Sequence, residues 1–220
     1  VSASGAAMNG ATALHLTIFG LNPVVKHGTE DLKQRILPAA ARGELHVAFG
    51  VTEPTAGSDT PSITTFARRD GDQFIVSGQK VWTSGAHLSD FGIVVTRTDA
   101  SLPKHKGLTM FIVDMKQAGV DVRPIHQASG GREFNEVYFT DVRIPDAQRL
   151  GAVNQGWEVS LTTLMNERLS IGSGMPTGFP ELFDFCMNLQ TEDGPAINDR
   201  GVRSRLASYA VKASGLKYTG

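Results

Sequence analysis

The sequence predicts an α+β protein, in which a helical segment precedes an antiparallel β-barrel or β-sandwich domain and a helical bundle segment follows it. Three observations predict this class. Residues 1–45 are rich in Ala and Leu and contain a helix start signal. Residues 46–153 alternate apolar and polar side chains and are rich in β-branched residues. Helical periodicity returns over residues 154–220. These three ranges are the predicted domains.

The first segment predicts two helices. Ala3 to Phe19 forms the first, on composition. The second begins after Thr29, which is a good cap because its hydroxyl can accept a hydrogen bond from the first turn, where two acidic residues follow. It is expected to end at Leu37, since Pro38 disfavours the helical conformation in the residue before it. A further short turn is expected up to Gly43.

The second segment predicts many short strands. Asp70-Gly71-Asp72 is a hairpin signal between two of them. The closely spaced strands indicate a barrel or sandwich, and the absence of a strand-helix alternation or a G-x-G-x-x-G turn argues against a dinucleotide-binding sheet. The predicted strands lie at residues 46–51, 66–69, 73–77, 91–98, 108–115, 120–125 and 135–143.

The third segment predicts a helix capped by Asn154 and a last helix that begins at Asp199. Arg168 falls inside the apolar stripe of the first of these helices, and Glu167 falls at its edge. A guanidinium in an apolar face needs an anion, and loss of water raises the pKa of a carboxyl toward that of a general base. A structural or surface ion pair explains both residues equally well. The stripe consists of Trp157, Leu161, Leu164, Met165 and Leu169.

Two stretches have the chemistry of a ligand site. The loop Thr52 to Ser58 consists of small residues after an apolar strand, so its backbone N–H groups and hydroxyls can approach a phosphate or a ring edge. Trp82 offers a flat apolar face beside the hydroxyls of Thr83 and Ser84, which suits a planar aromatic cofactor. Taken singly, the first stretch is more typical of a surface turn, and the second is more typical of a strand end with a core tryptophan.

Composition excludes several classes. The 220 residues are 40% hydrophobic and 20% charged, as in ordinary globular proteins, and the net charge of −1 predicts no attraction to nucleic acid or to an anionic membrane. No apolar run has the length of a membrane span, and no signal peptide is visible. Cys186 is the only cysteine and the six histidines are scattered, which predicts no metal site and a reducing, cytoplasmic location.

Together the two stretches resemble the acyl-CoA dehydrogenase family. The match consists of Phe49-Gly-Val-Thr-Glu-Pro-Thr-Ala-Gly-Ser-Asp59 and Gly78-Gln-Lys-Val-Trp-Thr-Ser-Gly-Ala86. It is specific because both motifs are long and occur in order. The resemblance continues at Gly28–Lys33, Phe134–Pro145 and Asn154–Trp157, and it weakens after about residue 174.

The resemblance implies that FAD lies between the β domain and the carboxy-terminal helices. Phe49, Val51 and Thr52 would lie along the flavin ring, with backbone groups and the Thr52 hydroxyl at its pyrimidine edge. Gly57 and Ser58 would meet the pyrophosphate, and Ser58 would also contact the acyl-CoA. Each role is carried over from the family motif onto the matching position.

The resemblance also implies a reaction. Trp82 would cover one face of the flavin, with Thr83 and Ser84 near N5, where donors stabilise the reduced ring. A carboxylate would remove the α proton of an acyl-CoA thioester while hydride passes from the β carbon to N5, giving a 2-enoyl-CoA. Glu167 is the candidate base and Arg168 a substrate-side residue, although in much of the family the base lies farther toward the carboxyl end.

The expected setting is that of an oxidoreductase of fatty-acid β-oxidation. An electron-transfer flavoprotein or similar acceptor, and a homodimer or homotetramer, are the implied partners. The family's usual Arg-x-x-Phe-Gly segment is not visible after Gly174, and Gln190–Asn198 stands in its place, so a partial chain is expected. Alternatives on the same fold are an acyl-CoA oxidase, a flavin-dependent monooxygenase and a non-catalytic flavin-binding subunit.

Overall fold

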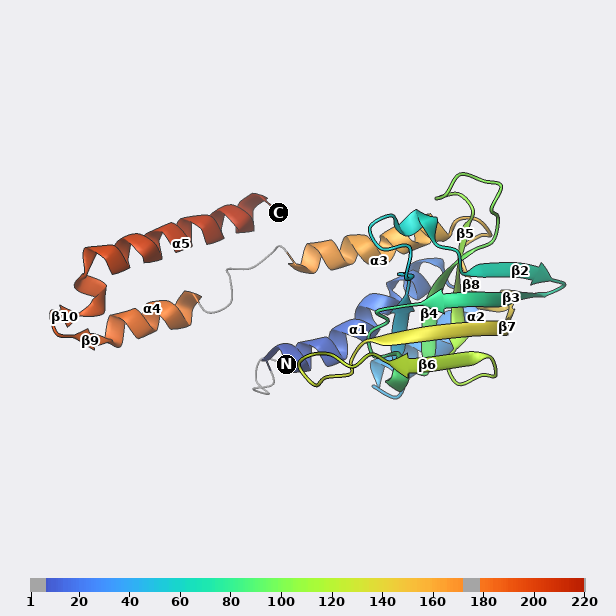
Figure 1. Ribbon diagram of the computed structural model, residues 1–220, viewed down its shortest axis with the longest axis horizontal. Coiled ribbons are helices and arrows are strands. Elements are labelled where there is room, and N and C mark those ends of the chain that lie inside the picture. Colours follow the sequence, from blue (N-terminus) through green and yellow to red (C-terminus); the bar gives the residue numbers. More distant parts are fainter. Residues whose placement is uncertain (1–6, 172–178, 220) are drawn as a thin grey trace. The chain divides into compact units, whose positions relative to one another are not determined.

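The computed structural model describes residues 7–171 and 179–219, and the side chains of residues 17–165 and 179–215 (Figure 1). The chain separates into two compact units, Val1–Leu164 and Met165–Gly220. The first unit contains the first two helices, the sheet and the start of the third helix, and the second is mainly helical. The predicted α+β class is confirmed. The three predicted domain ranges remain a prediction.

Helix α1 spans Ala7–His27 and therefore continues eight residues beyond the predicted end at Phe19. Helix α2 spans Glu30–Ala41, and Thr29 caps it as predicted, because its Oγ1 accepts a hydrogen bond from the Leu32 amide at 3.3 Å.

Replacing Thr29 by Ala is expected to lower the free energy of unfolding by about 1 kcal/mol. Urea denaturation of the two proteins measures this difference, and equal midpoints would contradict the cap's contribution.

The predicted end of α2 at Leu37 is wrong. Pro38 lies inside the helix, and its carbonyl accepts a hydrogen bond from the Arg42 amide at 3.2 Å. Proline removes one backbone donor from the ladder but leaves its own carbonyl available. Leu37, Ala39 and Ala40 also pack against the core, so tertiary contacts outweigh the local bias against a helical residue before proline.

Eight strands form one sheet, in the order β6-β7-β3-β2-β4-β5-β8, with β1 added beside β4. The predicted sheet was antiparallel, but the observed sheet is mixed, because β1 and β4 run parallel. No closed barrel forms among the described strands, since β6 and β8 end the order without pairing with each other. The strands are β1 (Val47–Gly50), β2 (Phe66–Asp70), β3 (Gln73–Lys80), β4 (Phe91–Arg97), β5 (Leu108–Asp114), β6 (Val120–Pro124), β7 (Asn135–Pro145) and β8 (Arg149–Leu150).

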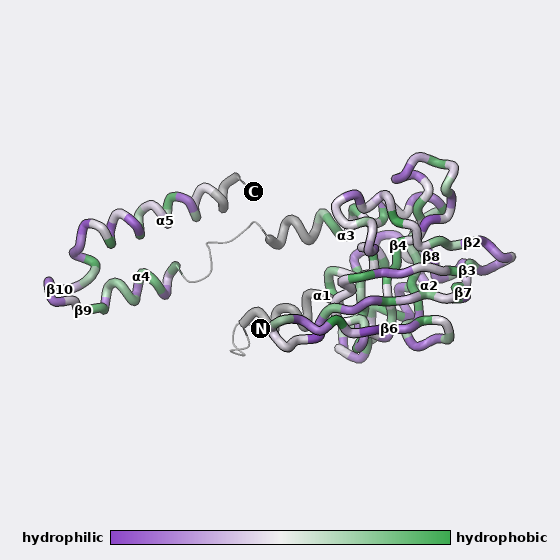
Figure 2. Tube along the Cα trace, in the orientation of Figure 1, coloured by the Kyte–Doolittle hydropathy of each residue, from purple (hydrophilic) through white to green (hydrophobic). Residues whose placement is uncertain are grey.

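The sheet has a core on each face. Strand β5 serves both, because successive side chains point to opposite faces. Met110 and Ile112 join the cluster that includes the buried residues of α1 and α2, whereas Phe111 and Val113 join a second cluster with β3 and β7. Figure 2 shows β6 as largely hydrophilic, in keeping with its place at the end of the strand order. The apolar runs predicted as strands therefore become the two-sided centre of the sheet.

The β2–β3 hairpin is confirmed, and it contains a position that requires glycine. Gly78 has φ +150°, and a Cβ added there would lie 2.6 Å from the Thr65 Cα. A β-bulge interrupts the β3–β7 register between Val76 and Gly78.

Replacing Gly78 by Ala is expected to destabilise the first unit by about 1–3 kcal/mol, through backbone strain and displacement of Thr65. Thermal denaturation measures this loss, and an unchanged Tm would refute the close approach.

Helix α3 spans Gly156–Ile171, and the prediction of Asn154 as its cap is wrong. Asn154 has φ +67°, and its side chain accepts a hydrogen bond from the Thr98 hydroxyl at 2.7 Å. Its amide donates to the Thr109 Oγ1 at 2.9 Å. Asn154 thus joins the chain to the sheet instead of capping the helix, because tertiary partners compete with the local cap geometry.

The apolar stripe predicted for α3 is not its buried face. Leu161 and Leu164 are half-buried, Met165 is 50% exposed, and the side chain of Leu169 lies outside the described residues. The start of the helix lies close against the sheet, since a Cβ at Gly156 would meet the Thr109 Cα at 2.6 Å. This approach selects the face with small residues. The buried face consists of Gly156, Val159, Ser160 and Thr163.

The second unit contains α4 (Phe179–Asn188), a short hairpin of β9 (Gln190–Thr191) and β10 (Gly194–Pro195), and α5 (Arg200–Thr219). The predicted last helix at Asp199 is confirmed, because Asp199 Oδ1 accepts a hydrogen bond from the Val202 amide at 2.8 Å. No helix in the described part of the chain is long and apolar enough to cross a membrane.

Candidate functional site

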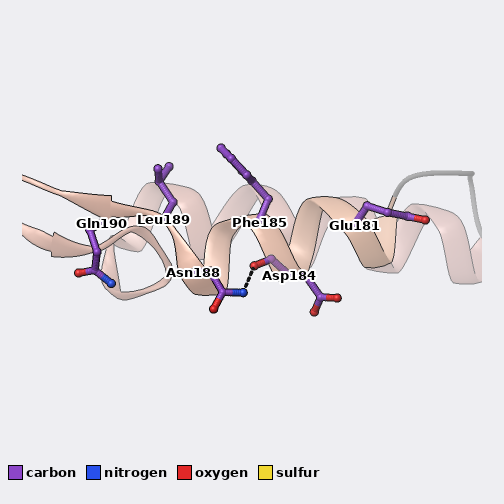
Figure 3. Close-up of a pocket in the computed structure, with 6 residues that line it drawn as sticks. All are labelled: Glu181, Asp184, Phe185, Asn188, Leu189 and Gln190. Atoms are coloured by element: carbon purple, nitrogen blue, oxygen red, sulfur yellow. Dashed lines mark hydrogen bonds between the residues drawn. The ribbon is translucent and has the colours of Figure 1, made fainter.

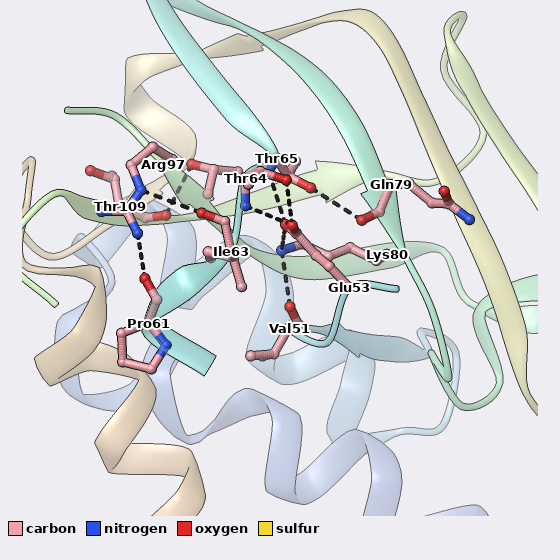
Figure 4. Close-up of polar contacts among 11 residues, drawn as sticks. Val51, Glu53, Pro61, Ile63, Thr64, Thr65, Gln79, Lys80, Arg97 and Thr109 are labelled. Carbon is pink, nitrogen blue, oxygen red and sulfur yellow. Dashed lines mark hydrogen bonds and ion pairs between the residues drawn. The ribbon is translucent and has the colours of Figure 1, made fainter. Parts of the chain in front are cut away.

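A fully buried ion pair joins the two stretches that the sequence singles out (Figure 4). Lys80, at the end of β3, is 0% exposed, and Glu53, in the loop after β1, is 3% exposed. The Lys80 Nζ donates to Glu53 Oε1 at 2.8 Å and to the Val51 carbonyl at 3.0 Å. A buried charge is tolerated only with such partners. Separating the two stretches would therefore leave a buried charge without its partner, which costs free energy.

Both carboxylate oxygens of Glu53 have further donors. Oε2 accepts from the Thr64 amide at 2.6 Å and from its hydroxyl at 2.8 Å, and Oε1 accepts from the Thr65 amide at 2.8 Å. Burial disfavours the charged carboxylate, but Lys80 and these hydrogen bonds outweigh burial and lower the pKa of Glu53 to about 2. Burial lowers the pKa of Lys80 to about 8, against the effect of Glu53. Both groups are therefore charged at neutral pH.

The backbone continues this connection. The Val81 amide donates to the Thr52 carbonyl at 2.9 Å. Three successive residues, Val51 to Glu53, are thus bonded to Lys80 and Val81. The structure therefore brings Val51 and Thr52 beside the chain segment that leads into Trp82.

Trp82 has an unusual backbone conformation. Its φ is +59°, a region that bulky residues rarely adopt, and its side chain is 57% exposed. The ring meets Phe134 edge to face, with centroids 6.1 Å apart. Strain of this kind persists where the surrounding contacts determine it and is concentrated at functional sites. The exposed indole is available as a platform for a planar ligand.

The two residues after Trp82 differ in exposure. Thr83 is 3% exposed, and its Oγ1 has no hydrogen-bond partner in the described part of the chain. Its side chain is buried, so the Thr83 hydroxyl is not exposed to a ligand outside. Ser84 is half-buried. Asn135 holds this segment, because its carbonyl accepts from the Thr83 amide at 3.0 Å and its Nδ2 donates to the Thr83 carbonyl at 2.9 Å.

Gly57 and Ser58 lie in an exposed part of the first loop. A Cβ at Gly57 would meet nothing within 4 Å, so the backbone there is open to a ligand. The next residue, Asp59, is bonded to Lys104 at 2.7 Å, which ties the loop to the β4–β5 connection. These residues and Trp82 belong to separate segments, so they would approach a common ligand from different parts of the chain.

The free hydroxyls provide a test of whether a flavin fits. Within the described part of the chain, the hydroxyls of Thr52, Ser58 and Ser84 make no side-chain hydrogen bond. They are thus available to the acceptor atoms of a flavin ring and a pyrophosphate. With the exposed indole of Trp82 and the open backbone at Gly57, they form a donor set that fits this cofactor.

The remaining predicted residues are placed as follows. Phe49 is half-buried beside α1, where its ring meets Phe19 edge to face at 5.7 Å. The backbones of Glu167 and Arg168 are helical in α3, but their side chains lie outside the described residues. These two residues belong to the second unit, whereas the stretches Thr52–Ser58 and Trp82–Ser84 belong to the first. The catalytic assignment of Glu167 therefore stays a prediction.

Sequence reasoning missed the roles of Glu53, Lys80 and Asn135. Each occurs within a family-like stretch, where the pattern alone gives it no separate role. A lysine followed directly by Val81 and Trp82, and an acidic residue in a loop of small residues, are signals for a buried pair because each needs a partner if it is buried. Asn135 has no such signal, since its role depends on the neighbouring segment.

Two other features do not form a comparable site. Figure 3 shows a shallow hollow on α4, where Phe185 and Leu189 lie on one side and Asn188 bonds to the Asp184 carbonyl at 2.8 Å. One helix and the start of the next strand line it, without convergent polar groups. Among the described residues, no group of three or more His, Cys, Asp or Glu side chains could hold a metal ion.

Two family models match most of the chain. The model described as "Acyl-CoA dehydrogenase, middle domain" matches residues 48–142, and the one described as "Acyl-CoA dehydrogenase, C-terminal domain" matches residues 154–220. The first match contains the stretches Thr52–Ser58 and Trp82–Ser84 and the Glu53–Lys80 pair. The second contains Glu167 and Arg168.

Curated relatives give the same family. The chain is 43% identical over 171 residues to the acyl-CoA dehydrogenase FadE29 of Mycobacterium tuberculosis, covering 77% of this chain and 43% of that protein. It is 34% identical over 219 residues to FadE26 of the same organism, covering 96% of this chain and 54% of that protein. The chain thus spans about half the length of these relatives.

A solved structure agrees. The Tcur3481-Tcur3483 steroid ACAD matches with a TM-score of 0.78 and 32% identity, covering 92% of this chain and 52% of that chain. Agreement in fold at this identity, over nearly the whole chain, supports the two family models. The chain belongs to the acyl-CoA dehydrogenase family.

Proposed function

We propose that the protein catalyses the FAD-dependent α,β-dehydrogenation of an acyl-CoA thioester to a 2-enoyl-CoA. The observation that carries this proposal is the Glu53–Lys80 pair, which joins the segment of Thr52 to the segment of the exposed Trp82 and of Ser84. When bound, FAD supplies the hydride acceptor for this reaction.

The residues of the chain have distinct tasks in this proposal. Thr52 and Ser84 would donate hydrogen bonds to the flavin when it is bound, and Trp82 would lie against the ring and exclude water from it. Gly57 and Ser58 provide open backbone and a hydroxyl for the pyrophosphate, and Ser58 also serves the acyl-CoA. Donors held in place before the reaction would stabilise the negative charge that develops during it.

Proton removal is proposed for Glu167. Its carboxylate would accept the α proton of the thioester, and Arg168 would hold the substrate or orient the carboxylate. The placement of both residues within the match to the C-terminal family domain supports the assignment. A base provided by a different part of the protein is the competing possibility.

The first test is an anaerobic visible spectrum of the purified protein, with all residues that its gene encodes, before and after acyl-CoA addition. The substrate mixture contains linear, branched and steroid-bearing thioesters, because one relative is described as a steroid ACAD. We expect a flavin band that bleaches on addition. A flavin band that is unchanged by every thioester would overturn the proposed activity, and purified protein that binds no FAD would overturn the cofactor as well.

A second test separates dehydrogenase from oxidase. With a bound flavin, we expect electrons to pass to an electron-transfer flavoprotein or a similar acceptor with little hydrogen peroxide. Rapid oxygen consumption with equivalent peroxide would favour the acyl-CoA oxidase alternative. The same proposal includes assembly as a homodimer or homotetramer, a cytoplasmic location and a role in fatty-acid oxidation. Sedimentation of the holoprotein checks the assembly.

A further inference from the structure

We propose that the Lys80–Glu53 ion pair positions the flavin by holding the Thr52 segment in register with the Trp82 segment. The inference rests on the proposed FAD-dependent function and extends it to residues that contact neither substrate nor reacting atoms. Lys80 and Glu53 are thus positioning residues.

The first step is that the bonds are concentrated at Thr52. The Lys80 Nζ bonds to the residue before Thr52 through the Val51 carbonyl at 3.0 Å, and to the residue after it through Glu53 Oε1 at 2.8 Å. The Thr52 carbonyl itself accepts from the Val81 amide at 2.9 Å. The segment therefore has three bonded points in succession, which leave the Thr52 side chain free but fix its backbone.

The second step is that Lys80 is only two residues from Trp82. Trp82 is held at φ +59°, which persists only where neighbouring contacts determine the backbone. On its far side, Asn135 bonds to both the amide and the carbonyl of Thr83. On its near side, Lys80 is the anchor. A change at Lys80 is thus transmitted both to the Thr52 segment and to the strained turn that presents the indole.

The third step concerns why charge is used here. A buried ion pair is often no more stabilising than apolar residues of similar volume, because both charges lose water. The advantage of the pair is that its hydrogen bonds are directional. Figure 4 shows that the Glu53 carboxylate accepts hydrogen bonds from Lys80, Thr64 and Thr65. Such a pair specifies one arrangement of two segments where an apolar contact permits several.

The main test uses the double variant K80M/E53Q in the protein with all its encoded residues. This change removes both charges together, so no uncompensated charge stays buried, and the amide oxygen of the introduced glutamine can still accept from Thr65. The measurements are the FAD dissociation constant by fluorescence titration, the midpoint potential and the visible absorption spectrum. We expect at least a tenfold weaker affinity, a shifted potential and a changed band shape.

The matched control is Ile144→Ala. Ile144 is fully buried in the same sheet, but it lies on β7 seven residues beyond Val137, the residue that pairs with Lys80. The control is expected to lower stability without altering affinity, potential or spectrum. If Ile144→Ala changes the flavin as much as the double variant does, the effect is general destabilisation and the positioning proposal is wrong. A double variant whose flavin matches that of the wild type would also overturn it.

A milder variant, Glu53→Asp, keeps the proposal testable if the double variant does not fold. It keeps both charges and withdraws the carboxylate by one methylene, so we expect changes in the same direction but smaller, at most tenfold in affinity. Wild-type flavin properties in this variant would contradict the need for register. Wild-type protein that binds no FAD overturns the proposed function first, whereas wild-type binding with unaltered variants overturns only the positioning proposal.

Discussion

Glu167→Gln is expected to lower the turnover of acyl-CoA dehydrogenation by about 10²–10⁴-fold, the range that a general base contributes. Glutamine has the same shape but cannot accept the α proton, so the loss should be in kcat and the affinity for the thioester should change little. Stopped-flow bleaching of the flavin by a saturating acyl-CoA measures this step directly.

The matched control for this substitution is Glu158→Gln. Glu158 is an exposed acidic residue in the first turn of the same helix, and its removal should leave bleaching unchanged. A Glu167→Gln protein that bleaches at the wild-type rate would exclude Glu167 from the mechanism and place the base elsewhere in the protein. An intact flavin spectrum in the variant confirms that the fold and the cofactor site are retained.

Lys80→Met alone is expected to lower the free energy of unfolding of the first unit by about 3–5 kcal/mol. The reason is that Glu53 would then be a buried carboxylate without its cation, held only by neutral donors. Urea denaturation monitored by tryptophan fluorescence measures the loss. The double variant K80M/E53Q should recover much of it, because the unpaired charge is then absent.

An exposed ion pair provides the comparison. Lys116 bonds to Asp90, and the Lys116 side chain is 72% exposed. Lys116→Met removes the same residue type from the same unit, and its effect should be below about 1 kcal/mol because water screens an exposed pair. Equal losses from Lys80→Met and Lys116→Met would show that burial of the Glu53–Lys80 pair has no energetic consequence.

The pH dependence of stability should reverse in the Lys80→Met protein. In the wild type, the pKa of Glu53 is about 2 in the folded chain and near 4.5 when unfolded. The unfolded chain then binds more protons between these values, so stability is present above about pH 4.5 and falls by about 3 kcal/mol as the pH decreases through them. Without Lys80, burial should raise the pKa of Glu53 above its unfolded value.

The variant should therefore gain stability, relative to neutral pH, as the pH falls toward its raised folded pKa and then toward 4.5. Urea titrations of both proteins from pH 3 to pH 8 test this difference in sign. Parallel pH profiles would mean that Lys80 does not govern the ionisation of Glu53.

Local signals in the sequence were sufficient for most elements. The hairpin at Gly71 follows from its turn residues, and the starts of α2 and α5 follow from the caps Thr29 and Asp199. These features depend on residues close together in the chain. The predicted cap at Asn154 failed because its partners, Thr98 and Thr109, are distant in sequence.

The helix patterns show the same limit. A stripe of large apolar residues was expected to be the buried face of α3, but the close approach of Gly156 to Thr109 selects the small-residue face instead. The end of α2 was misplaced because the packing of Leu37, Ala39 and Ala40 outweighs the bias before Pro38. In both cases a tertiary contact overrides a local preference of less than a few kcal/mol.

By itself, the sequence determined the α+β class, the family and the two loops with ligand chemistry, because each is encoded in short, ordered patterns. Only the tertiary structure decided that β1 runs parallel to β4, that Thr83 faces the interior, and that Lys80 and Glu53 form one buried pair. Such contacts join residues far apart in the chain, and a buried charge reveals the identity of its partner only when the fold brings the two together.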